Sequence, residues 1–265
     1  MPRNVLVVGE AGLLASYLAA SRLLSTDDSV FFDIDCAEGP FSDDELATLV
    51  RHAIRQVALN EHLDSFEGRL HRPVWESNGE QTGLSKTSLG ETLVSEVWYV
   101  SGGHRWPSSL SALLRILPQL GATELNYVRY AYAVGDPEEA AATERNVIEQ
   151  CEANGVGFRI FRVSLIIGPN PPLKGPDREG FLQFLWNVHD LKREIEERRP
   201  EYFEYQSLRC LAKVDASLNL IRVDQAAEMM LDLARRPSTI RRSYNIGGPE
   251  NIPFADICEC WKGER

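Results

Sequence analysis

Two patterns of hydrophobic positions alternate along the chain. Short apolar runs, as in 4–8, 29–34 and 94–100, are separated by stretches in which apolar residues recur at helical spacing, as in 13–24. Short continuous runs are typical of buried β-strands, and the longer period is typical of amphipathic helices. Strands that alternate with helices form a parallel sheet with helices on both faces. The first half of the chain therefore predicts an α/β fold.

The alternation continues through the rest of the chain. The pattern predicts helices over 42–57, 108–117, 136–154, 181–199 and 224–235, and strands over 125–134, 158–167, 218–222 and 243–246. Ser42 with Glu45 forms a capping box, and Asp136 with Pro137 marks the start of another helix. Residues 71–91 are polar and show no strong period, so they are expected to form a loop.

The charge balance narrows the range of partners. The 265 residues include 28 lysines and arginines and 39 aspartates and glutamates, so the formal net charge is −11. Proteins that bind a phosphate backbone normally carry excess positive charge, so nucleic acid is not an expected partner.

No apolar run reaches the roughly 20 residues that cross a bilayer, so no membrane partner is expected. The apolar run from Val5 to Gly9 is too short for a secretion signal, so we expect a cytoplasmic protein.

The five cysteines do not form a recognisable pattern. Cys36, Cys151 and Cys210 are far apart in the chain, and a single residue separates Cys258 from Cys260. Neither a metal-ligand set nor a disulfide framework has this spacing. Reduced thiols and no metal site are therefore expected.

A glycine-containing turn joins the first expected strand to the first expected helix. Gly9, Gly12 and Ala15 occupy the small-residue positions of a turn that lets backbone N–H groups and a helix N-terminus face a pyrophosphate. We expect Gly9 to permit the turn and Gly12 to permit close approach of the cofactor. Glu10 adds a negative charge beside the expected pyrophosphate, which leaves open a turn that no longer binds any cofactor.

Asp33 lies at the end of the second expected strand. An acidic residue at this position accepts hydrogen bonds from an adenosine ribose and repels a 2′-phosphate, so NAD is expected rather than NADP.

Together with the alternating elements, the glycine-containing turn predicts a doubly wound, Rossmann-type parallel sheet with a small C-terminal substrate lobe. Residues 1–169 are expected to form the dinucleotide-binding core. Residues 170–265 are expected to form the lobe with returning core elements, all as a single structural unit.

Several motifs that follow one another along the chain carry a family resemblance. The glycine turn and the segments 162–169 (RVSLIIGP) and 244–248 (YNIGG) resemble the extended short-chain dehydrogenase/reductase superfamily. The segments 68–73 (GRLHRP), 127–135 (YVRYAYAVG) and 218–224 (LNLIRVD) resemble its thioester reductase and fatty acyl reductase branch. The resemblance extends over nearly the whole chain. It implies NAD(P) binding and a small-molecule or acyl-thioester substrate.

The resemblance also implies which residues contact a cofactor. The Gly102–Gly103 pair follows the fourth family strand, where the cofactor passes close to the backbone. Arg69 replaces the acidic residue of a glycine-acid-leucine motif, so Arg69 could stack on a base, hold a phosphate or lie in solvent. The expected cofactor-binding residues are Gly9, Ala11, Gly12, Leu13, Leu14, Asp33, Arg69, Leu70, Gly102 and Gly103.

The catalytic positions of the family are altered in this chain. The resemblance implies a tyrosine, a lysine four residues later and a serine or threonine, which act together on one substrate oxygen. Counting back from Arg162 through Glu144 places the tyrosine position at Asp136 and the lysine position at Ala140. The serine or threonine position is Tyr130. Ordinary carbonyl reduction is therefore not expected.

Three side chains are candidates for catalysis. Tyr130 and Tyr132 alternate on one expected strand and share a face, so Tyr130 could donate a hydrogen bond or a proton. Packing of a buried ring is the alternative for Tyr130. His104 follows a strand at the edge where open α/β sheets place ligands, and a solvated loop histidine is its alternative.

Two further features have more than one interpretation. Arg129 is expected on the face opposite to Tyr130, where either Glu144 or Glu124 could neutralise it. The apolar stripe on the expected helix 181–199 could line a pocket, pack in the core or contact a second copy in a homodimer.

Three classes of function fit these residues. The first is an atypical enzyme of this superfamily in a biosynthetic pathway, which performs acid–base chemistry such as isomerisation, cyclisation or elimination. The second is an NAD(P)-dependent reductase of a thioester or carbonyl with relocated catalytic groups. The third is a catalytically inactive nucleotide-sensing or scaffold protein. The first is preferred, because every standard catalytic group is replaced while the cofactor turn is kept.

Overall fold

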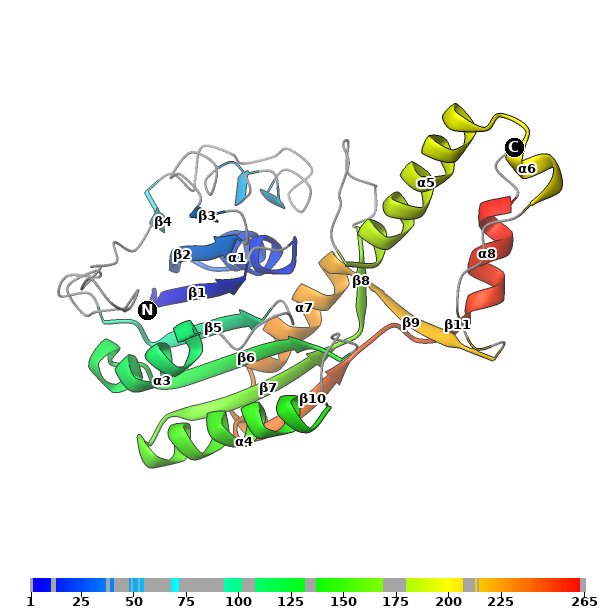
Figure 1. The fold of residues 1–265 in the computed structure, drawn as a ribbon. Coiled ribbons are helices and arrows are strands. Elements are labelled where there is room, and N and C mark those ends of the chain that lie inside the picture. Colours follow the sequence, from blue (N-terminus) through cyan, green and yellow to red (C-terminus); the bar gives the residue numbers. More distant parts are fainter. Residues whose placement is uncertain are drawn as a thin grey trace.

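The computed structural model describes residues 2–10, 13–36, 39–40, 48, 50–51, 53–54, 68–71, 93–101, 108–131, 137–168, 180–206, 213 and 215–262. In these residues the chain forms a central sheet with helices on both faces and a second, smaller sheet beyond one end of the central one (Figure 1).

Among the described residues the central sheet has eight strands, in the order β10-β7-β6-β5-β1-β2 with β3 and β4 both paired to β2. Every strand pair is parallel except β2 with β3. The strands are β1 (Asn4–Glu10), β2 (Ser29–Cys36), β3 (Gly39–Pro40), β4 (Leu70–His71), β5 (Glu96–Ser101), β6 (Glu124–Tyr130), β7 (Gly157–Val163) and β10 (Arg242–Ile246). This mostly parallel sheet confirms the Rossmann-type α/β fold that the sequence predicts.

Helices cover both faces of the central sheet. Helices α1 (Leu13–Ser25) and α7 (Val223–Ala234) pack on one face, and α3 (Ser108–Leu120) and α4 (Pro137–Ala153) pack on the other (Figure 1). We call the two hydrophobic clusters beneath them the α1/α7 core and the α3/α4 core.

Alternate residues of each central strand enter different cores. Val5 and Val7 of β1 lie in the α1/α7 core, whereas Leu6 and Val8 lie in the α3/α4 core. Successive side chains of a strand point to opposite faces, so a strand that is covered on both sides needs a continuous apolar sequence. The unbroken apolar runs that predicted the strands have this origin.

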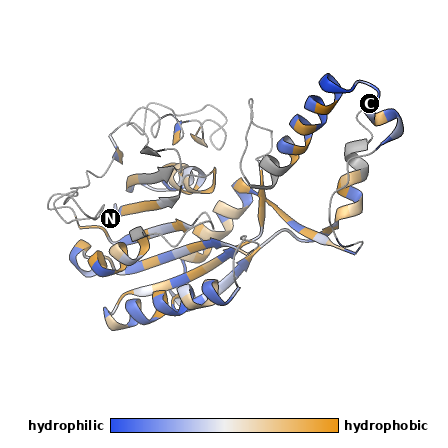
Figure 2. Cartoon of the chain, viewed as in Figure 1, coloured by the Kyte–Doolittle hydropathy of each residue, from blue (hydrophilic) through white to orange (hydrophobic). Residues whose placement is uncertain are grey.

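The second sheet consists of β11 (Asn251–Pro253), β9 (Ser217–Arg222) and β8 (Leu165–Ile167), in that order. Helix α5 (Gly180–Arg198) extends away from β8 towards the short helix α6 (Tyr202–Tyr205), and α8 (Phe254–Lys262) follows β11 (Figure 1). The end of α5 that is farthest from the sheets is strongly hydrophilic (Figure 2). Its paired charges include Glu194 with Arg198 at 2.6 Å, and both side chains are exposed.

The expected strand 158–167 is divided between the two sheets. β7 ends at Val163, and the backbone N–H of Ser164 donates to the carbonyl oxygen of Ile246 in β10. The chain then leaves the central sheet, and β8 pairs with β9 instead. Because both segments are apolar and extended, their sequence does not reveal the change of sheet.

The other expected elements agree with the structure within a few residues, apart from the strand 125–134, the helix 42–57 and the loop 71–91. Strand β6 ends at Tyr130, whereas the sequence pattern predicts a strand to residue 134. Residues 48, 50–51 and 53–54 of the expected helix 42–57 are helical, and the rest of it lies outside the described residues. The expected loop over 71–91 also lies outside them, except for residue 71 at the end of β4.

Candidate functional site

The strand order changes direction at β1. Strand β1 pairs with β2 on one side and with β5 on the other. Helix α1, which follows β1, packs in the α1/α7 core, whereas α3, which follows β5, packs in the α3/α4 core. The chain therefore leaves the ends of these neighbouring strands towards opposite faces. In open α/β sheets this divergence produces the crevice in which ligands bind.

Gly9 lies near the end of β1, at the edge of the sheet where the parallel strands end. It is opposite Ile34 of β2 and Val100 of β5. Its φ is +139°, and a Cβ at this position would lie 2.0 Å from the carbonyl oxygen of Val100. Both the backbone conformation and the approach of β5 therefore require glycine. Gly9 thus meets a structural demand of the sheet itself. Gly12, which is expected to permit close approach of the cofactor, lies outside the described residues.

Helix α1 begins at Leu13, three residues after the end of β1, and its first turn contains no acidic residue. Its partial positive charge at the N-terminus is therefore not cancelled by a carboxylate of the same turn. Leu14 is fully buried in the α1/α7 core, so only its backbone remains for contact with a ligand. A pyrophosphate fits the chemistry of this helix start.

The structure places only some of the other expected cofactor residues. The backbone of Asp33 lies in β2 opposite Val8, one residue before the pair formed by Gly9 and Ile34. It therefore shares the edge of Gly9, as a ribose contact requires. The expected residues that lie outside the described part of the chain are Ala11, Gly12, Gly102, Gly103, His104 and Tyr132.

Arg69 and Leu70 lie at the opposite edge of the sheet. Leu70 pairs with Val30 near the start of β2. The Arg69 guanidinium donates to the carbonyl oxygens of Thr26 at 2.6 Å and Leu23 at 2.9 Å, at the end of α1. A cation is favourable there because the last carbonyls of a helix are negative. We therefore correct the expectation that Arg69 and Leu70 contact the cofactor.

Tyr130 is the last residue of β6 and lies at the same edge as Gly9. Gly9 pairs with Val100, and Val100 pairs with Val128, which precedes Tyr130 by two residues. Two strand spacings separate β1 from β6, about 10 Å. The Tyr130 ring is half-buried and packs against the α1/α7 core. The strand register thus places the backbone of Tyr130 at the same edge of the sheet as Gly9.

Arg129 and Arg162 share one carboxylate on the other face of the sheet. Arg129 Nε donates to Glu144 Oε1 at 2.5 Å, and Arg162 donates to both oxygens of Glu144, at 2.8 and 2.5 Å. This decides between the two partners that the sequence allowed for Arg129. Glu124 instead binds Arg159, at 2.6 Å.

The two arginines change the acidity of Glu144. Burial raises the pKa of its carboxyl, but the hydrogen bonds from Arg162 and Arg129 and their charges outweigh burial. The pKa therefore lies below its ordinary value of 4.5. Glu144 is thus a carboxylate at neutral pH and does not supply a proton.

A second group of charged side chains is buried where the sequence analysis did not place one. Glu96 is 2% exposed and accepts hydrogen bonds from Arg22, Trp98 and Asn126. Asn126 in turn accepts one from Arg159, which is 1% exposed. We call these five residues the buried polar network. Its only sequence signal is a charged residue inside an apolar strand run, as with Glu96 and Arg159.

Other expected chemistry is limited in the residues that the structure describes. No three His, Cys, Asp or Glu side chains among them are arranged to hold a metal ion. Nor does any helix in this part of the chain have the length and apolar character needed to cross a membrane. Cys151 and Cys258 are free. Burial raises the pKa of the Cys151 thiol to about 12, so it stays protonated and is a poor nucleophile.

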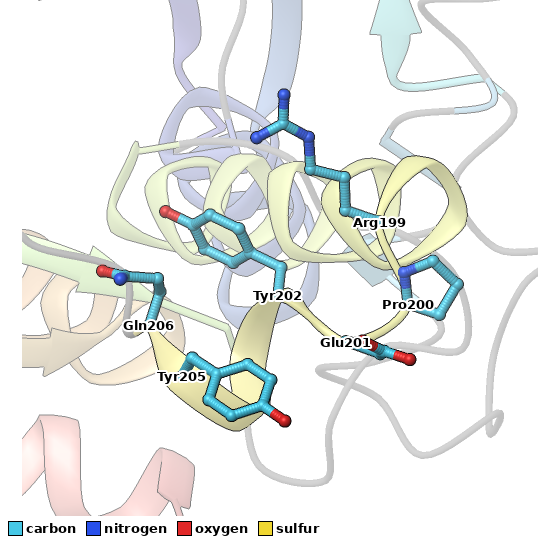
Figure 3. A pocket seen from close by; sticks show the side chains of 6 residues that line it. All are labelled: Arg199, Pro200, Glu201, Tyr202, Tyr205 and Gln206. Atoms are coloured by element: carbon cyan, nitrogen blue, oxygen red, sulfur yellow. The ribbon is translucent and has the colours of Figure 1, made fainter.

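A shallow hollow lies at the turn between α5 and α6 (Figure 3). It is lined by Arg199, Pro200, Glu201, Tyr202, Tyr205 and Gln206. All six residues are exposed or half-buried, and Tyr205 is 77% exposed. These side chains are far along the chain from Gly9 and Tyr130, and α6 lies well away from β1 (Figure 1). The hollow is therefore not part of the site at the sheet edge.

The sequence matches no protein-family model and no curated protein. Solved structures do match over nearly the whole chain. The terminal R domain from the myxalamid PKS-NRPS biosynthetic pathway has a TM-score of 0.64 and 16% identity, covering 98% of this chain and 70% of that one.

Two further matches are structures with bound ligands. A short-chain dehydrogenase/reductase superfamily protein from Agrobacterium tumefaciens with bound NAD has a TM-score of 0.58 and 14% identity, covering 97% of this chain and 80% of that one. UDP-glucose 4-epimerase from Thermotoga maritima with UDP-glucose has a TM-score of 0.55 and 12% identity. The match covers 98% of this chain and 81% of the epimerase chain. At these identities the likeness concerns the fold. The chain thus shares the fold of these three solved structures.

Proposed function

We propose that this chain is an NAD(P)-binding enzyme of the short-chain dehydrogenase/reductase type that performs acid–base chemistry without net redox change. The reactions that we propose are an isomerisation, a cyclisation or an elimination in a biosynthetic pathway. The observation that carries the proposal is the divergence of α1 and α3 from the neighbouring strands β1 and β5. This arrangement supports a ligand crevice at the edge that also holds Tyr130.

The residues at this edge fit a dinucleotide in two respects. The first turn of α1 has no acidic residue, and Asp33 is on the neighbouring strand at the level of Val8. We propose that the backbone at Gly9, Ala11 to Leu14, Gly102 and Gly103 holds the cofactor, with Asp33 at the ribose. A bound nicotinamide would supply reversible hydride transfer.

Asp136 and Ala140 occupy the positions of the family's tyrosine and lysine, so we do not expect ordinary carbonyl reduction. These positions come from counting back along the sequence from Arg162 through Glu144. An alanine cannot hold a charge near a catalytic hydroxyl, and an aspartate has a much lower pKa than a tyrosine. The chain therefore lacks the usual proton donor and the group that tunes it.

We assign the remaining acid–base role to Tyr130, with Tyr132 and His104 as further catalytic candidates. A phenol with an ordinary pKa near 10 is protonated at neutral pH and donates a hydrogen bond or proton to a substrate oxygen. An imidazole can accept a proton at neutral pH. One donor and one acceptor are enough for an isomerisation or elimination. The 4-epimerase with this fold supports a reaction that leaves the substrate at the same oxidation level.

We expect NAD to bind more tightly than NADP in a calorimetric titration. The Asp33 carboxylate would accept ribose hydroxyls and repel a 2′-phosphate, so Asp33→Asn should reduce the preference about 10- to 100-fold. Asp232→Asn is the matched control, because Asp232 forms an exposed pair with Arg235 on α7. Equal or tighter binding of NADP by the unaltered protein would contradict this assignment. If neither nucleotide binds, the proposed function fails.

We also expect no appreciable oxidation of NADH or NADPH with acyl thioesters or aldehydes, because the usual proton donor is replaced. The measurement is the absorbance of the reduced nicotinamide during incubation with each substrate. A turnover of about 1 per second or more lies within the usual range for enzymes and would favour the reductase alternative. In that case Tyr130→Phe, which keeps the ring and removes the hydroxyl, would test whether Tyr130 supplies the proton.

A further inference from the structure

Two arginines lie side by side near the candidate crevice. Arg129 of β6 and Arg162 of β7 are direct partners in the strand register. Like charges on directly opposite positions of neighbouring strands repel each other, so this arrangement needs a compensating negative charge. Glu144 supplies one, and it contacts both guanidinium groups.

The compensation is incomplete among the residues that the structure describes. One carboxylate faces two guanidinium groups, which leaves a net charge of +1 at this position. The buried arginines elsewhere are better matched. Arg22 has two carboxylates, Asp28 and Glu96, each at 2.7 Å. This local excess of positive charge is unusual in a chain with a net charge of −11.

The arginines also keep hydrogen-bond donors that the described contacts do not use. Arg162 employs Nε and Nη2 on Glu144, and Arg129 employs Nε on Glu144 and Nη1 on the Tyr130 carbonyl oxygen. A guanidinium has five N–H donors, so Nη1 of Arg162 and Nη2 of Arg129 have donors left. The Arg162 side chain is 33% exposed and that of Arg129 is 19% exposed, so a ligand can reach them.

The position relates the pair to the candidate site. Arg129 precedes Tyr130 in β6 and hydrogen-bonds to its carbonyl oxygen at the edge where β6 ends. Arginine is well suited to anionic ligands because its planar N–H groups match carboxylate and phosphate oxygens. We propose that Arg129 and Arg162 bind an anionic group of the substrate, a carboxylate or a phosphate. This deepens the proposed function, on which it rests for the identification of the ligand as a substrate.

The structure supplies a variant that separates binding from folding. Arg129→Gln leaves Arg162 and Glu144 as a neutral pair with two hydrogen bonds and removes the repulsion between the arginines. We therefore expect Arg129→Gln to be at least as stable as the unaltered protein. Arg222→Gln is the matched control, because the Arg222 side chain is 36% exposed and pairs with a single acid, Asp224.

The test follows the melting midpoint during titration with inorganic phosphate and, separately, with succinate, at constant ionic strength set with chloride. We expect at least one anion to raise the midpoint of the unaltered protein and of Arg222→Gln. In Arg129→Gln the apparent affinity for that anion should fall about 10- to 100-fold, as expected for loss of a charged hydrogen bond. A response to phosphate alone identifies a phosphorylated ligand, and a response to succinate alone identifies a carboxylate.

Two results would overturn the proposal. One is the absence of any response beyond that to chloride, and the other is an equal response in Arg129→Gln and the unaltered protein. NAD titration of the unaltered protein tests the proposed function separately. A protein that binds NAD but shows no anion response at Arg129 would retain the proposed function and refute this site alone.

Discussion

Replacing Glu96 with alanine is expected to lower the free energy of unfolding by about 3–5 kcal/mol, the usual cost of removing one member of a buried ion pair. Arg22 and Trp98 each donate to Glu96 at 2.7 Å, and Asn126 donates at 3.3 Å. All three donors are almost completely buried. Without the carboxylate they lose a partner that water cannot replace. Urea denaturation monitored by circular dichroism measures the change.

Glu197→Ala is the matched control for Glu96→Ala. Glu197 also pairs with an arginine, Arg193, but both side chains are about two-thirds exposed and the distance is 3.6 Å. Exposed pairs of this kind contribute little, so the denaturation midpoint should hardly change. If Glu96→Ala changes the free energy of unfolding by less than about 1 kcal/mol, the buried polar network does not stabilise the fold as we describe.

Glu144→Gln is expected to destabilise the protein by about 3 kcal/mol, because it leaves Arg129 and Arg162 facing each other without a negative charge. Arg129→Gln in the same background should recover part of this loss, since it removes one of the two positive charges. The measurement is a double-mutant cycle based on urea denaturation at neutral pH. Strictly additive effects of the two substitutions would contradict the shared-carboxylate arrangement.

The same site predicts a dependence of stability on pH. The pKa of Glu144 is lower in the folded protein than its ordinary value of 4.5. The folded state therefore holds the carboxylate more firmly than the unfolded state. The resulting stabilisation is complete above the unfolded pKa and disappears as the pH falls from about 4.5 through the folded pKa. Over this range the unaltered protein should lose more stability than Glu144→Gln, which has no carboxyl at this position to titrate.

Much of the fold follows from local features of the sequence. Strands with both faces covered are apolar throughout, as β1 and β5 illustrate, and helices such as α4 begin with proline and acidic residues. These signals depend on neighbours along the chain, so they can be recognised before any tertiary contact is known. The position of Gly9 between β1 and α1 is of the same kind, although its close contact with Val100 is not.

The candidate site could be predicted only in outline. The backbone of Tyr130 lies at the edge of Gly9, because the ends of parallel strands meet at one edge of the sheet. Arg69 lies at the opposite edge, because β4 has only two residues and pairs with the start of β2. A motif in the sequence carries no information about the register of so short a strand. The glycine-acid-leucine resemblance therefore misplaced Arg69.

The sequence thus contains the order and type of the elements and the residues available for chemistry, because hydrophobic period, caps and turns are properties of short segments. It does not contain the choice of Glu144 over Glu124 as the partner of Arg129, the assembly of the buried polar network around Glu96 or the division of 158–167 between two sheets. These depend on strand register and helix docking, which bring together residues that are distant along the chain. Many pairings of such residues are compatible with one hydrophobic pattern, and packing of the complete sheet selects among them.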